Sequence, residues 1–339
     1  MRIFVYESTC AGECPLAFEE PSLLAEGRAM LVSVLQDLLN IVFAGPEDPV
    51  VHTIWDPRCG PIPMADSGRL IVTSPRSNQT EIDHYRECCA GSDLTLIIAP
   101  EWDGILQERC EIASQCGGIT LNCQPAIVGL CSDKLRLNEH LARQGIKCLP
   151  AISMTSLPKD TEQFVIKPRY GVGSIGIDML SRAELLEREI HSSTHIVQPF
   201  IAGRALSVGL IFGRTGQLLT RLPVAVQHLS TDGHFSYLGG EIPASGITNE
   251  MIDEIVEQVA QAIHGLRGYV GIDMIQNRDY ELPILVEINP RLTTSYVGYR
   301  AAMSANIMEC LLQDKACQMT VVRSVAFTSG GQIQVLDRI

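Results

Sequence analysis

Hydrophobic residues in the first third of the chain alternate between the spacing of strands and the spacing of helices. Three short apolar runs predict strands, at Ile3–Tyr6, Val50–Trp55 and Asp93–Pro100. Apolar residues that recur every three or four positions predict helices, over Ser22–Leu39, 80–91 and 103–118. Because this alternation is typical of a parallel sheet flanked by helices, we expect a parallel α/β domain over 1–125.

The rest of the chain has more glycine-rich turns between its apolar runs. The predicted elements are a helix over 132–145 that starts at Ser132 or Asp133, strands on both sides of the loop Tyr170–Gly176, strands on both sides of Ala202 and Gly203, an amphipathic helix over Asn249–Gly265, and paired strands at 268–277 and 282–291. The last strand differs from the others because it carries polar residues at alternate positions.

Glu287, Asn289 and Arg291 share one face of this last strand, since residues two apart point the same way, whereas Val286 and Ile288 point the other way. Two oxygen ligands followed by a positive charge suit a divalent cation beside a phosphate. The alternative is a half-exposed strand with its polar residues in water. Independent parts of a phosphate site are needed to decide between the two.

Two such parts lie earlier in the chain. The loop Tyr170–Gly176 has three glycines, which let the backbone approach a ligand, although tight hairpins also need glycine. It has no P-loop sequence, and no helix follows it as in dinucleotide sites. Lys167, on the apolar strand before the loop, is costly to bury and suits a phosphate. Lys134 is a second candidate, with a solvated surface lysine as the alternative.

A further carboxylate completes a set of oxygen ligands. Asp273 lies inside a predicted strand between Ile272 and Met274, where an unpaired carboxylate is costly. Together with Glu287 and Asn289 it supplies the oxygen atoms that one or two magnesium ions shared with phosphate need. The sequence therefore predicts a metal and phosphate site.

The composition of the chain restricts the kinds of molecule that the protein is expected to bind. With 339 residues, 46% of them hydrophobic, and a net charge of −13, the chain is predicted to be globular, and its acidity argues against nucleic acid and anionic membranes. No apolar run reaches membrane-spanning length, and the N-terminus is unlike a secretory signal. The 12 cysteines lack the spacing of zinc sites, so we expect free, mostly buried thiols in a cytoplasmic protein.

In their order and spacing from Lys134 to Arg291, these parts resemble the ATP-grasp carboxylate–amine ligases. More narrowly, the segments SLLAEGRAML, IIAPEWDGIL and EINPRLTTSYVG are similar to the tyramine–glutamate ligase group of methanofuran biosynthesis and its bacterial relatives. The resemblance implies an ATP-grasp fold, in which the N-terminal Rossmann-like α/β domain is followed by two α+β lobes, over 126–200 and 201–339, that clasp the nucleotide.

The resemblance also implies roles for individual residues. ATP would be bound by Lys134, Lys167, Gly171, Gly173 and Ser174 and, at the adenine hinge, by Gln198, Phe200 and Ile201. One or two Mg²⁺ ions, with Mn²⁺ as an alternative, would be held by Asp273, Glu287 and Asn289.

This chain departs from the family pattern at three positions. Gln198 and Ala205 stand where many members have acids for the hinge and the ribose, and Gly271 stands where some peptide-forming members have an arginine. We therefore expect Arg291 to stabilise the tetrahedral intermediate, with Lys167 as the second catalytic residue.

The implied reaction is amide formation with cleavage of ATP to ADP. A substrate carboxylate takes the γ-phosphoryl group, and an amine then displaces phosphate from the acyl phosphate. Glutamate and a tyramine- or tyrosine-like amine are the expected substrates, and homodimerisation is left open. The alternatives are a small-molecule kinase, in which a hydroxyl takes the phosphoryl group, and a non-catalytic nucleotide sensor, which the intact metal ligands disfavour.

Polar residues that follow the strands of the first domain suggest where the substrates bind. Glu7 and Ser8 follow one strand and Glu101 and Asp103 follow another, so in a parallel sheet all four would converge on one edge. We expect this edge to bind the amine, with solvated loop acids or helix caps as the alternative. The acid substrate is expected to lie near Arg291, Thr293, Thr294 and Ser295.

Overall fold

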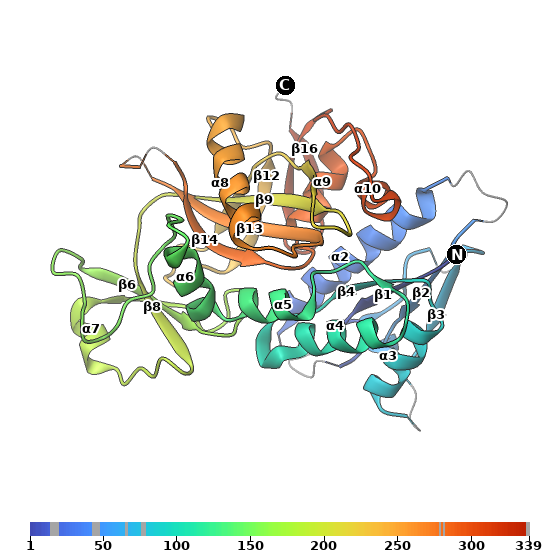
Figure 1. Ribbon diagram of the computed structural model, residues 1–339, viewed down its shortest axis with the longest axis horizontal. Coiled ribbons are helices and arrows are strands. Elements are labelled where there is room, and N and C mark those ends of the chain that lie inside the picture. Colours follow the sequence, from blue (N-terminus) through green and yellow to red (C-terminus); the bar gives the residue numbers. More distant parts are fainter. Residues whose placement is uncertain are drawn as a thin grey trace.

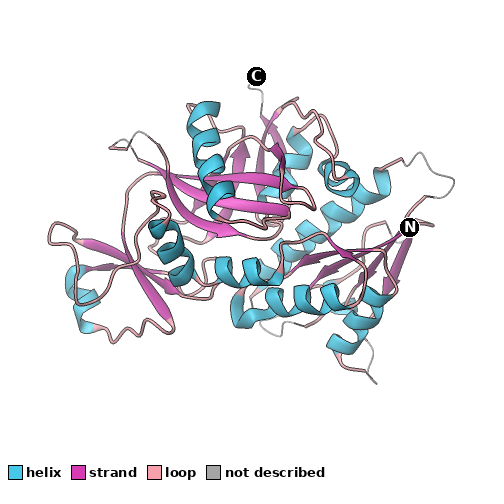
Figure 2. Cartoon of the chain, viewed as in Figure 1, coloured by secondary structure: helices cyan, strands magenta, loops and turns pink. Residues whose placement is uncertain are grey.

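The computed structural model describes residues 1–13, 20–42, 48–64, 67–75, 79–277, 279–280 and 282–336. Three sheets, each with its own helices, follow one another along the chain (Figure 1). The first and the largest sheets are covered by several helices each, whereas the small sheet has one short helix beside it (Figure 2).

The first sheet is parallel throughout and has the strand order β3-β2-β1-β4-β5. Its strands are β1 (Arg2–Glu7), β2 (Val50–Ile54), β3 (Leu70–Thr73), β4 (Leu94–Ile98) and β5 (Ile119–Thr120). Alternate residues of β1 point to opposite faces: Ile3 packs with helix α2 (Pro21–Asn40), and Phe4 packs with the helices of the other face. The predicted parallel α/β domain is confirmed, and β3 is a strand that the apolar pattern did not single out.

Helices surround this sheet and lead to the next one. They are α3 (Glu81–Ala90), α4 (Ile105–Gln115), α5 (Pro125–Ser132) and α6 (Lys134–Arg143), with short 3₁₀ turns at Pro57–Cys59 and Trp102–Gly104. Asp133 caps α6, because its carboxylate accepts a hydrogen bond from the backbone N–H of Arg136. Of the two starting residues expected for this helix, the structure selects Asp133.

A small antiparallel sheet of order β7-β6-β8 forms the second lobe, at the left of Figure 1. Its elements are β6 (Gln163–Pro168), β7 (Asp178–Ser181), α7 (Arg182–Glu187) and β8 (His195–Pro199). Five buried residues make its core, Phe164, Ile166, Leu180, Leu185 and Val197. Because this core is separate from the two larger apolar clusters, the lobe packs as a unit of its own.

The third sheet has the order β14-β13-β9-β11-β12-β15-β16, with β10 beside β9. Its strands are β9 (Arg204–Phe212), β10 (Leu218–Arg221), β11 (Ala225–Leu229), β12 (Tyr237–Ile242), β13 (Gly268–Gln276), β14 (Ile284–Asn289), β15 (Ser324–Thr328) and β16 (Ile333–Leu336). Its helices are α8 (Asn249–Ala262), α9 (Ser295–Ala302) and α10 (Ile307–Gln313). One apolar cluster joins Phe4 and Tyr85 to Leu206 and Val270, so the first domain and this lobe share a core.

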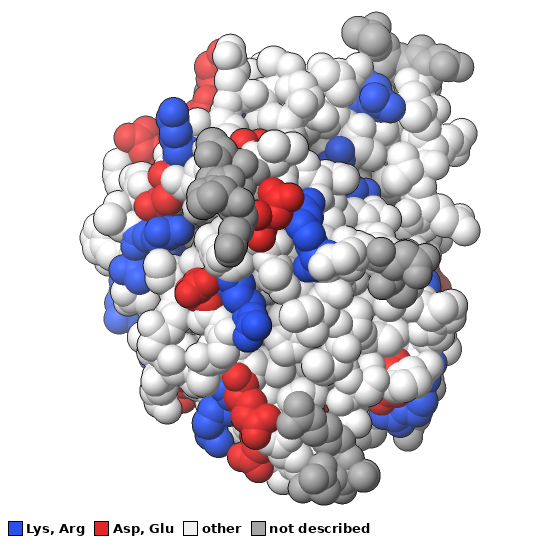
Figure 3. All heavy atoms as spheres, turned by 90° about the vertical axis from the view of Figure 1, so that its right-hand side faces the viewer, with Lys and Arg blue, Asp and Glu red and all other residues white. Residues whose placement is uncertain are grey.

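The three sheets fall inside the three predicted segments, whose boundaries at 125 and 200 stay a prediction. Within the described ranges, no helix is long and apolar enough to cross a membrane. On the face shown in Figure 3, the described acidic and basic side chains lie in small mixed groups rather than in one basic patch.

Candidate active site

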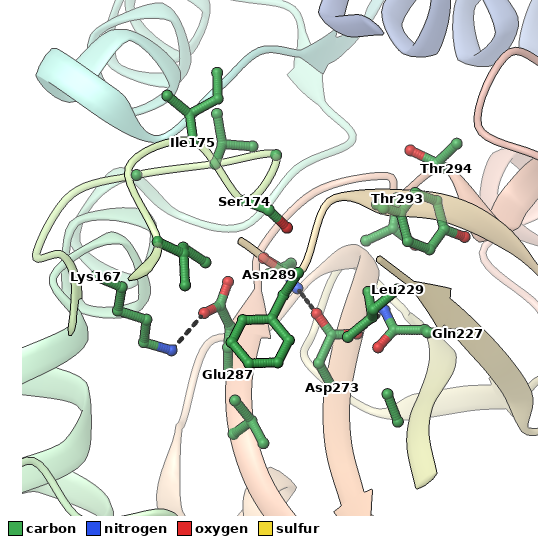
Figure 4. Close-up of a pocket in the computed structure, with 18 of the residues that line it drawn as sticks. Lys167, Ser174, Ile175, Gln227, Leu229, Asp273, Glu287, Asn289, Thr293 and Thr294 are labelled. Atoms are coloured by element: carbon green, nitrogen blue, oxygen red, sulfur yellow. Dashed lines mark hydrogen bonds and ion pairs between the residues drawn. The ribbon is translucent and has the colours of Figure 1, made fainter. Parts of the chain in front are cut away.

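A cavity of about 660 Å³ lies between the three parts of the molecule. The first domain contributes Glu7, the small lobe contributes Lys167 and the loop after it, and the third lobe contributes Asp273 and Glu287. Its volume is typical of sites that take a small molecule or a cofactor. Figure 4 shows the part of the cavity between the loop of the small lobe and strands β13 and β14.

Strands β13 and β14 bring the predicted metal ligands together. The antiparallel register places Asp273 opposite Glu287 and Gly271 opposite Asn289. A bulge interrupts the pairing just beyond Asp273, so Val286 lines the cavity next to Glu287. The prediction that Val286 points away from Glu287 is therefore wrong, because strict alternation does not survive a bulge.

The two carboxylates have opposite electrostatic environments. Asp273 accepts hydrogen bonds from Gln227 at 3.0 Å and from Asn289 at 2.9 Å, yet burial and the charge of Glu287 raise its pKa to about 6. Burial alone would raise the pKa of Glu287 as well, but Lys134 and Lys167 outweigh this and lower it to about 2. Of the two carboxylates, Glu287 is therefore the one that the surrounding charges favour in its ionised form.

Lys167 is buried, with 5% of its surface exposed, and its Nζ lies 3.1 Å from Oε2 of Glu287 (Figure 4). Burial lowers the pKa of this lysine, and Glu287 offsets part of that effect. Lys134 also lines the cavity, and its Nζ donates a 2.7 Å hydrogen bond to the carbonyl of Gly171. The structure therefore places both predicted lysines at the cavity instead of leaving Lys134 on the surface.

The loop after Lys167 is fixed at its base, and its tip lines the cavity. Asp133 accepts two 2.7 Å hydrogen bonds from Arg169 and one from the Tyr170 hydroxyl, which ties the start of the loop to α6. Gly173 and Ser174 both have positive φ, at 65° and 60°. Ser174 points from the loop into the cavity (Figure 4). This arrangement suits a flap that covers a ligand.

Strand β8 borders a more apolar end of the cavity. Gln198 is buried and donates a 2.8 Å hydrogen bond to the carbonyl of Leu149, while Phe200 and Ile201 line the wall. The rings of Phe200 and Phe235 are stacked with centroids 6.0 Å apart. An apolar slot with aromatic sides and nearby backbone polar groups fits a flat heterocycle.

Arg291 lies just beyond the end of β14 and lines the same cavity. Its Nε donates a 2.8 Å hydrogen bond to Oε1 of Glu101, and both residues are buried. Burial by itself would lower the pKa of Arg291, but the neighbouring carboxylates raise it, Glu101 most strongly. Glu101 is therefore an ion-pair partner of Arg291 rather than an open acid.

The four polar residues of the first sheet do not all converge on the cavity. Glu7 lines it, but its oxygens accept hydrogen bonds from Thr9 and from the backbone N–H of Cys10. The Ser8 side chain is fully buried and does not line the cavity. Asp103 is exposed, and neither it nor Glu101 lines the cavity, so Glu7 alone of the four residues reaches it.

The segment after β14 also lies along the cavity, since Thr293, Thr294 and Ser295 all line it. A Cβ atom on Gly271 would lie 2.5 Å from Cγ2 of Thr293. Thr293 thus fills the space that a side chain at position 271 would need, the position at which some family members carry an arginine. Thr294 donates a 2.9 Å hydrogen bond to Oε2 of Glu26, on helix α2.

Glu26 and Gln227 are cavity residues that the sequence reasoning missed. Gln227 gave no signal in the sequence, because nothing distinguishes it from its polar neighbour His228 on the interior strand β11. Glu26 had one: it stands at helical spacing between the apolar residues Leu23 and Met30, where a carboxylate interrupts an apolar stripe.

The donors at the centre of the site fit a divalent cation. Two carboxylates and one carboxamide, from Asp273, Glu287 and Asn289, lie on adjacent strands at the cavity wall. Hard oxygen donors of this kind suit Mg²⁺, which usually takes only a few protein ligands and fills the remaining positions with phosphate oxygens and water. The residues present are therefore compatible with a metal shared with a phosphate.

Comparison with known proteins agrees with this geometry. Two domain families match the chain, the ATP-grasp domain over 131–295 and the pre ATP-grasp 3 domain over 50–128. Two tyramine–L-glutamate ligases are similar to it. The one from Methanocaldococcus jannaschii is 26% identical over 88% of this chain and 85% of the relative, and the one from Methanocaldococcus fervens is 29% identical over 85% and 87%.

Solved structures show the same fold. An ATP-grasp superfamily protein from Archaeoglobus fulgidus matches with a TM-score of 0.71 and 27% identity, over 97% of this chain and 92% of that one. N5-carboxyaminoimidazole synthetase from Staphylococcus aureus, solved with ADP, matches with a TM-score of 0.68 and 13% identity, over 96% and 81%. The chain therefore belongs to the ATP-grasp family of ATP-dependent ligases.

Proposed function

We propose that this chain is an ADP-forming ligase that joins a carboxylic acid to a primary amine in the cavity between its three lobes. The observation that carries the proposal is the pairing of Asp273 with Glu287 across β13 and β14, beside the buried Lys167. The names of the similar ligases support glutamate as the acid and a tyramine-like molecule as the amine.

The nucleotide would lie between the hinge and the flap. Its base fits the slot at Phe200, Ile201 and Gln198, and its phosphates would reach Lys134 and Lys167. Gly171, Gly173 and Ser174 would cover the phosphates from the flap. Because Lys167 is paired with Glu287 before any ligand binds, it is already held at the position where negative charge arrives.

A divalent cation held by Asp273, Glu287 and Asn289, which we propose to be Mg²⁺, would neutralise phosphate oxygens during phosphoryl transfer. The chain's own residues orient the reacting groups around it. Glu287 is ionised and fixed by Lys167, and Asp273 is oriented by Gln227 and Asn289. These contacts hold the oxygen donors in place before the ligand binds.

Arg291 would stabilise the oxyanion that forms when the amine attacks the acyl phosphate. Its guanidinium is fixed by Glu101 and by the carbonyl of Leu292, so the charge is oriented in advance. The flap would keep water away from the acyl phosphate, which hydrolyses readily when it is exposed.

The test is ADP release by the purified protein with ATP, Mg²⁺ and pairs of amines and acids, combined with mass detection of products. We expect glutamate plus a tyramine-like amine to raise ADP release and to yield a product whose mass is that of the two substrates less water. Phosphorylation of a hydroxyl compound without any amine would support a kinase instead. Absence of ADP release with every pair would contradict the proposed activity.

A further inference from the structure

Helix α2 presents one carboxylate to the cavity between two apolar side chains. Leu23, Glu26, Gly27 and Met30 all line the cavity, at the spacing of one helical face. A Cβ atom on Gly27 would lie 2.4 Å from Oγ1 of Thr9 and 2.7 Å from the carboxyl carbon of Glu7. Glycine at this position therefore lets the helix lie close against the loop that follows β1.

Glu26 differs from the other carboxylates of the cavity in what its oxygens contact. Both oxygens of Glu7 are occupied by Thr9 and Cys10, and Asp273 and Glu287 belong to the proposed metal site. Glu101 is paired with Arg291 and does not line this cavity. Oε2 of Glu26 accepts a hydrogen bond from Thr294, and the described part of the chain provides no hydrogen-bond partner for its Oε1. Glu26 thus keeps one oxygen available to a ligand.

The surroundings of Glu26 place it near the expected reaction centre. Burial raises its pKa, against the opposing effects of the Thr294 hydrogen bond and of the Arg291 charge. Arg291 is the residue proposed to stabilise the tetrahedral intermediate. The flap also reaches this end of the cavity, since a Cβ atom on Gly173 would lie 3.0 Å from Cδ2 of Leu23.

We propose, resting on the amide-forming activity above, that Glu26 binds the ammonium group of the amine substrate and accepts its first proton, while Leu23 and Met30 contact an apolar body attached to that group. A lone carboxylate flanked by apolar side chains recognises a primary amine on an aromatic or aliphatic body. It disfavours an amine whose body is strongly polar, because that group would lose water without gaining partners.

The proton balance of the step is complete without any further reactant. The ammonium group gives one proton to the carboxylate of Glu26, and the neutral nitrogen then forms a bond to the carbonyl carbon of the acyl phosphate. The carbon–oxygen bond to phosphate breaks, and the second proton of the attacking nitrogen leaves with the phosphate. Glu26 returns its proton to water when the products depart.

The test compares two nucleophiles in Glu26→Gln. The glutamine keeps an acceptor for Thr294 but cannot hold a cation or take a proton. We expect the KM for tyramine to rise about tenfold or more, as for the loss of a charge-assisted hydrogen bond, and kcat with tyramine to fall. Hydroxylamine is largely uncharged at neutral pH, so its ATP- and glutamate-dependent conversion to the hydroxamate should be retained.

Two further variants keep the result interpretable. Glu20→Gln makes the same chemical change at the exposed N-cap of α2 and should leave all constants unchanged. Glu26→Asp keeps the charge but shortens the side chain, so its KM for tyramine should be intermediate, and it replaces Glu26→Gln if that variant does not fold.

An unchanged KM for tyramine in Glu26→Gln, or equal loss of the tyramine and hydroxylamine reactions, would overturn the role of Glu26 while leaving the ligase activity in place. If the wild-type protein releases no ADP with glutamate and any nucleophile, the proposed function fails instead, and this role fails with it.

Discussion

The two ends of the cavity are built in different ways. At the phosphate end, Asp273 and Glu287 face each other on the paired strands β13 and β14, and Lys167 from the small lobe adds the opposite charge. At the amine end, Glu26 and Arg291 come from parts of the chain that are far apart, and each has its own partner: Thr294 lies 268 residues from Glu26, and Glu101 lies 190 residues from Arg291.

This difference has a functional consequence. In the proposed function, the cluster at the phosphate end would bind what every reaction of such a ligase shares, the nucleotide and its metal. The amine end is assembled from a helix of the first domain and the segment after β14, and in our proposal only this end would contact the variable part of the substrates. A change at the phosphate end should therefore stop every reaction, whereas a change at the amine end should affect some reactions and spare others.

The largest effect is expected for Glu287→Gln. Loss of a metal ligand that is also the partner of Lys167 should lower ATP turnover at least about a hundredfold with any nucleophile. Steady-state ADP release checks this, and circular dichroism should show an intact fold. Glu254→Gln, the same change on the exposed side of α8, is the matched control. Near-normal turnover of Glu287→Gln would remove Glu287 from the metal site.

A large loss of stability is expected for Arg291→Met, because it leaves the buried carboxylate of Glu101 without a partner. The expected cost is about 3–5 kcal/mol in the free energy of unfolding, and adding Glu101→Gln should recover much of it. Urea denaturation measures both. The control is Arg188→Met, which removes a partly exposed pair with Asp178 and should cost about 1 kcal/mol or less. Equal costs for the two arginines would contradict the buried ion pair.

A moderate effect on nucleotide affinity separates the two lysines. Lys167→Ala should weaken ATP binding about tenfold or more, since a buried ammonium group beside the phosphates is lost. Lys134→Ala should weaken it less, because Lys134 is less buried and also bonds to the flap carbonyl of Gly171. Titration calorimetry with ATP decides the order. Unchanged binding in Lys167→Ala would contradict its phosphate role.

The smallest effect concerns the anchor of the flap and depends on pH. Arg169 and Tyr170 bind the carboxylate of Asp133 and outweigh its burial, so its pKa in the folded protein lies below the value in the unfolded chain. Its contribution is therefore fully present above the unfolded pKa of about 3.9 and is lost as pH falls through the folded pKa. Asp133→Asn should cost about 1–2 kcal/mol near neutral pH. If the difference in unfolding free energy from wild type does not shrink at acid pH, the charge of Asp133 is not its cause.

Most of the phosphate end could be predicted from the sequence, because its residues are polar groups placed inside apolar strands. Lys167, Asp273 and Glu287 each stand where burial is costly, and the hairpin of β13 and β14 brings two of them together within a short stretch of chain. The bulge at Val286 could not be predicted, since it depends on the register between the two strands.

The amine end was predicted less well for a physical reason. Glu101 was expected as an open acid, but its partner Arg291 comes from the other end of the chain and neutralises it. Glu26 lies on a helix whose other inward residues form the core, so the periodic pattern predicted the helix correctly, and the carboxylate that interrupts its apolar stripe was the one sign of a site. Only the packing of α2 against β1 and the segment at Thr294 shows that this face of the helix meets a cavity.

The division of the cavity into two ends is tested most directly by measuring hydroxamate and amide formation side by side in two variants. With ATP, glutamate and either hydroxylamine or tyramine, Glu287→Gln should lose both products. Glu26→Gln should lose the tyramine amide and keep the hydroxamate. If Glu26→Gln keeps both products, or if both variants lose both, the two ends do not have the separate roles assigned to them.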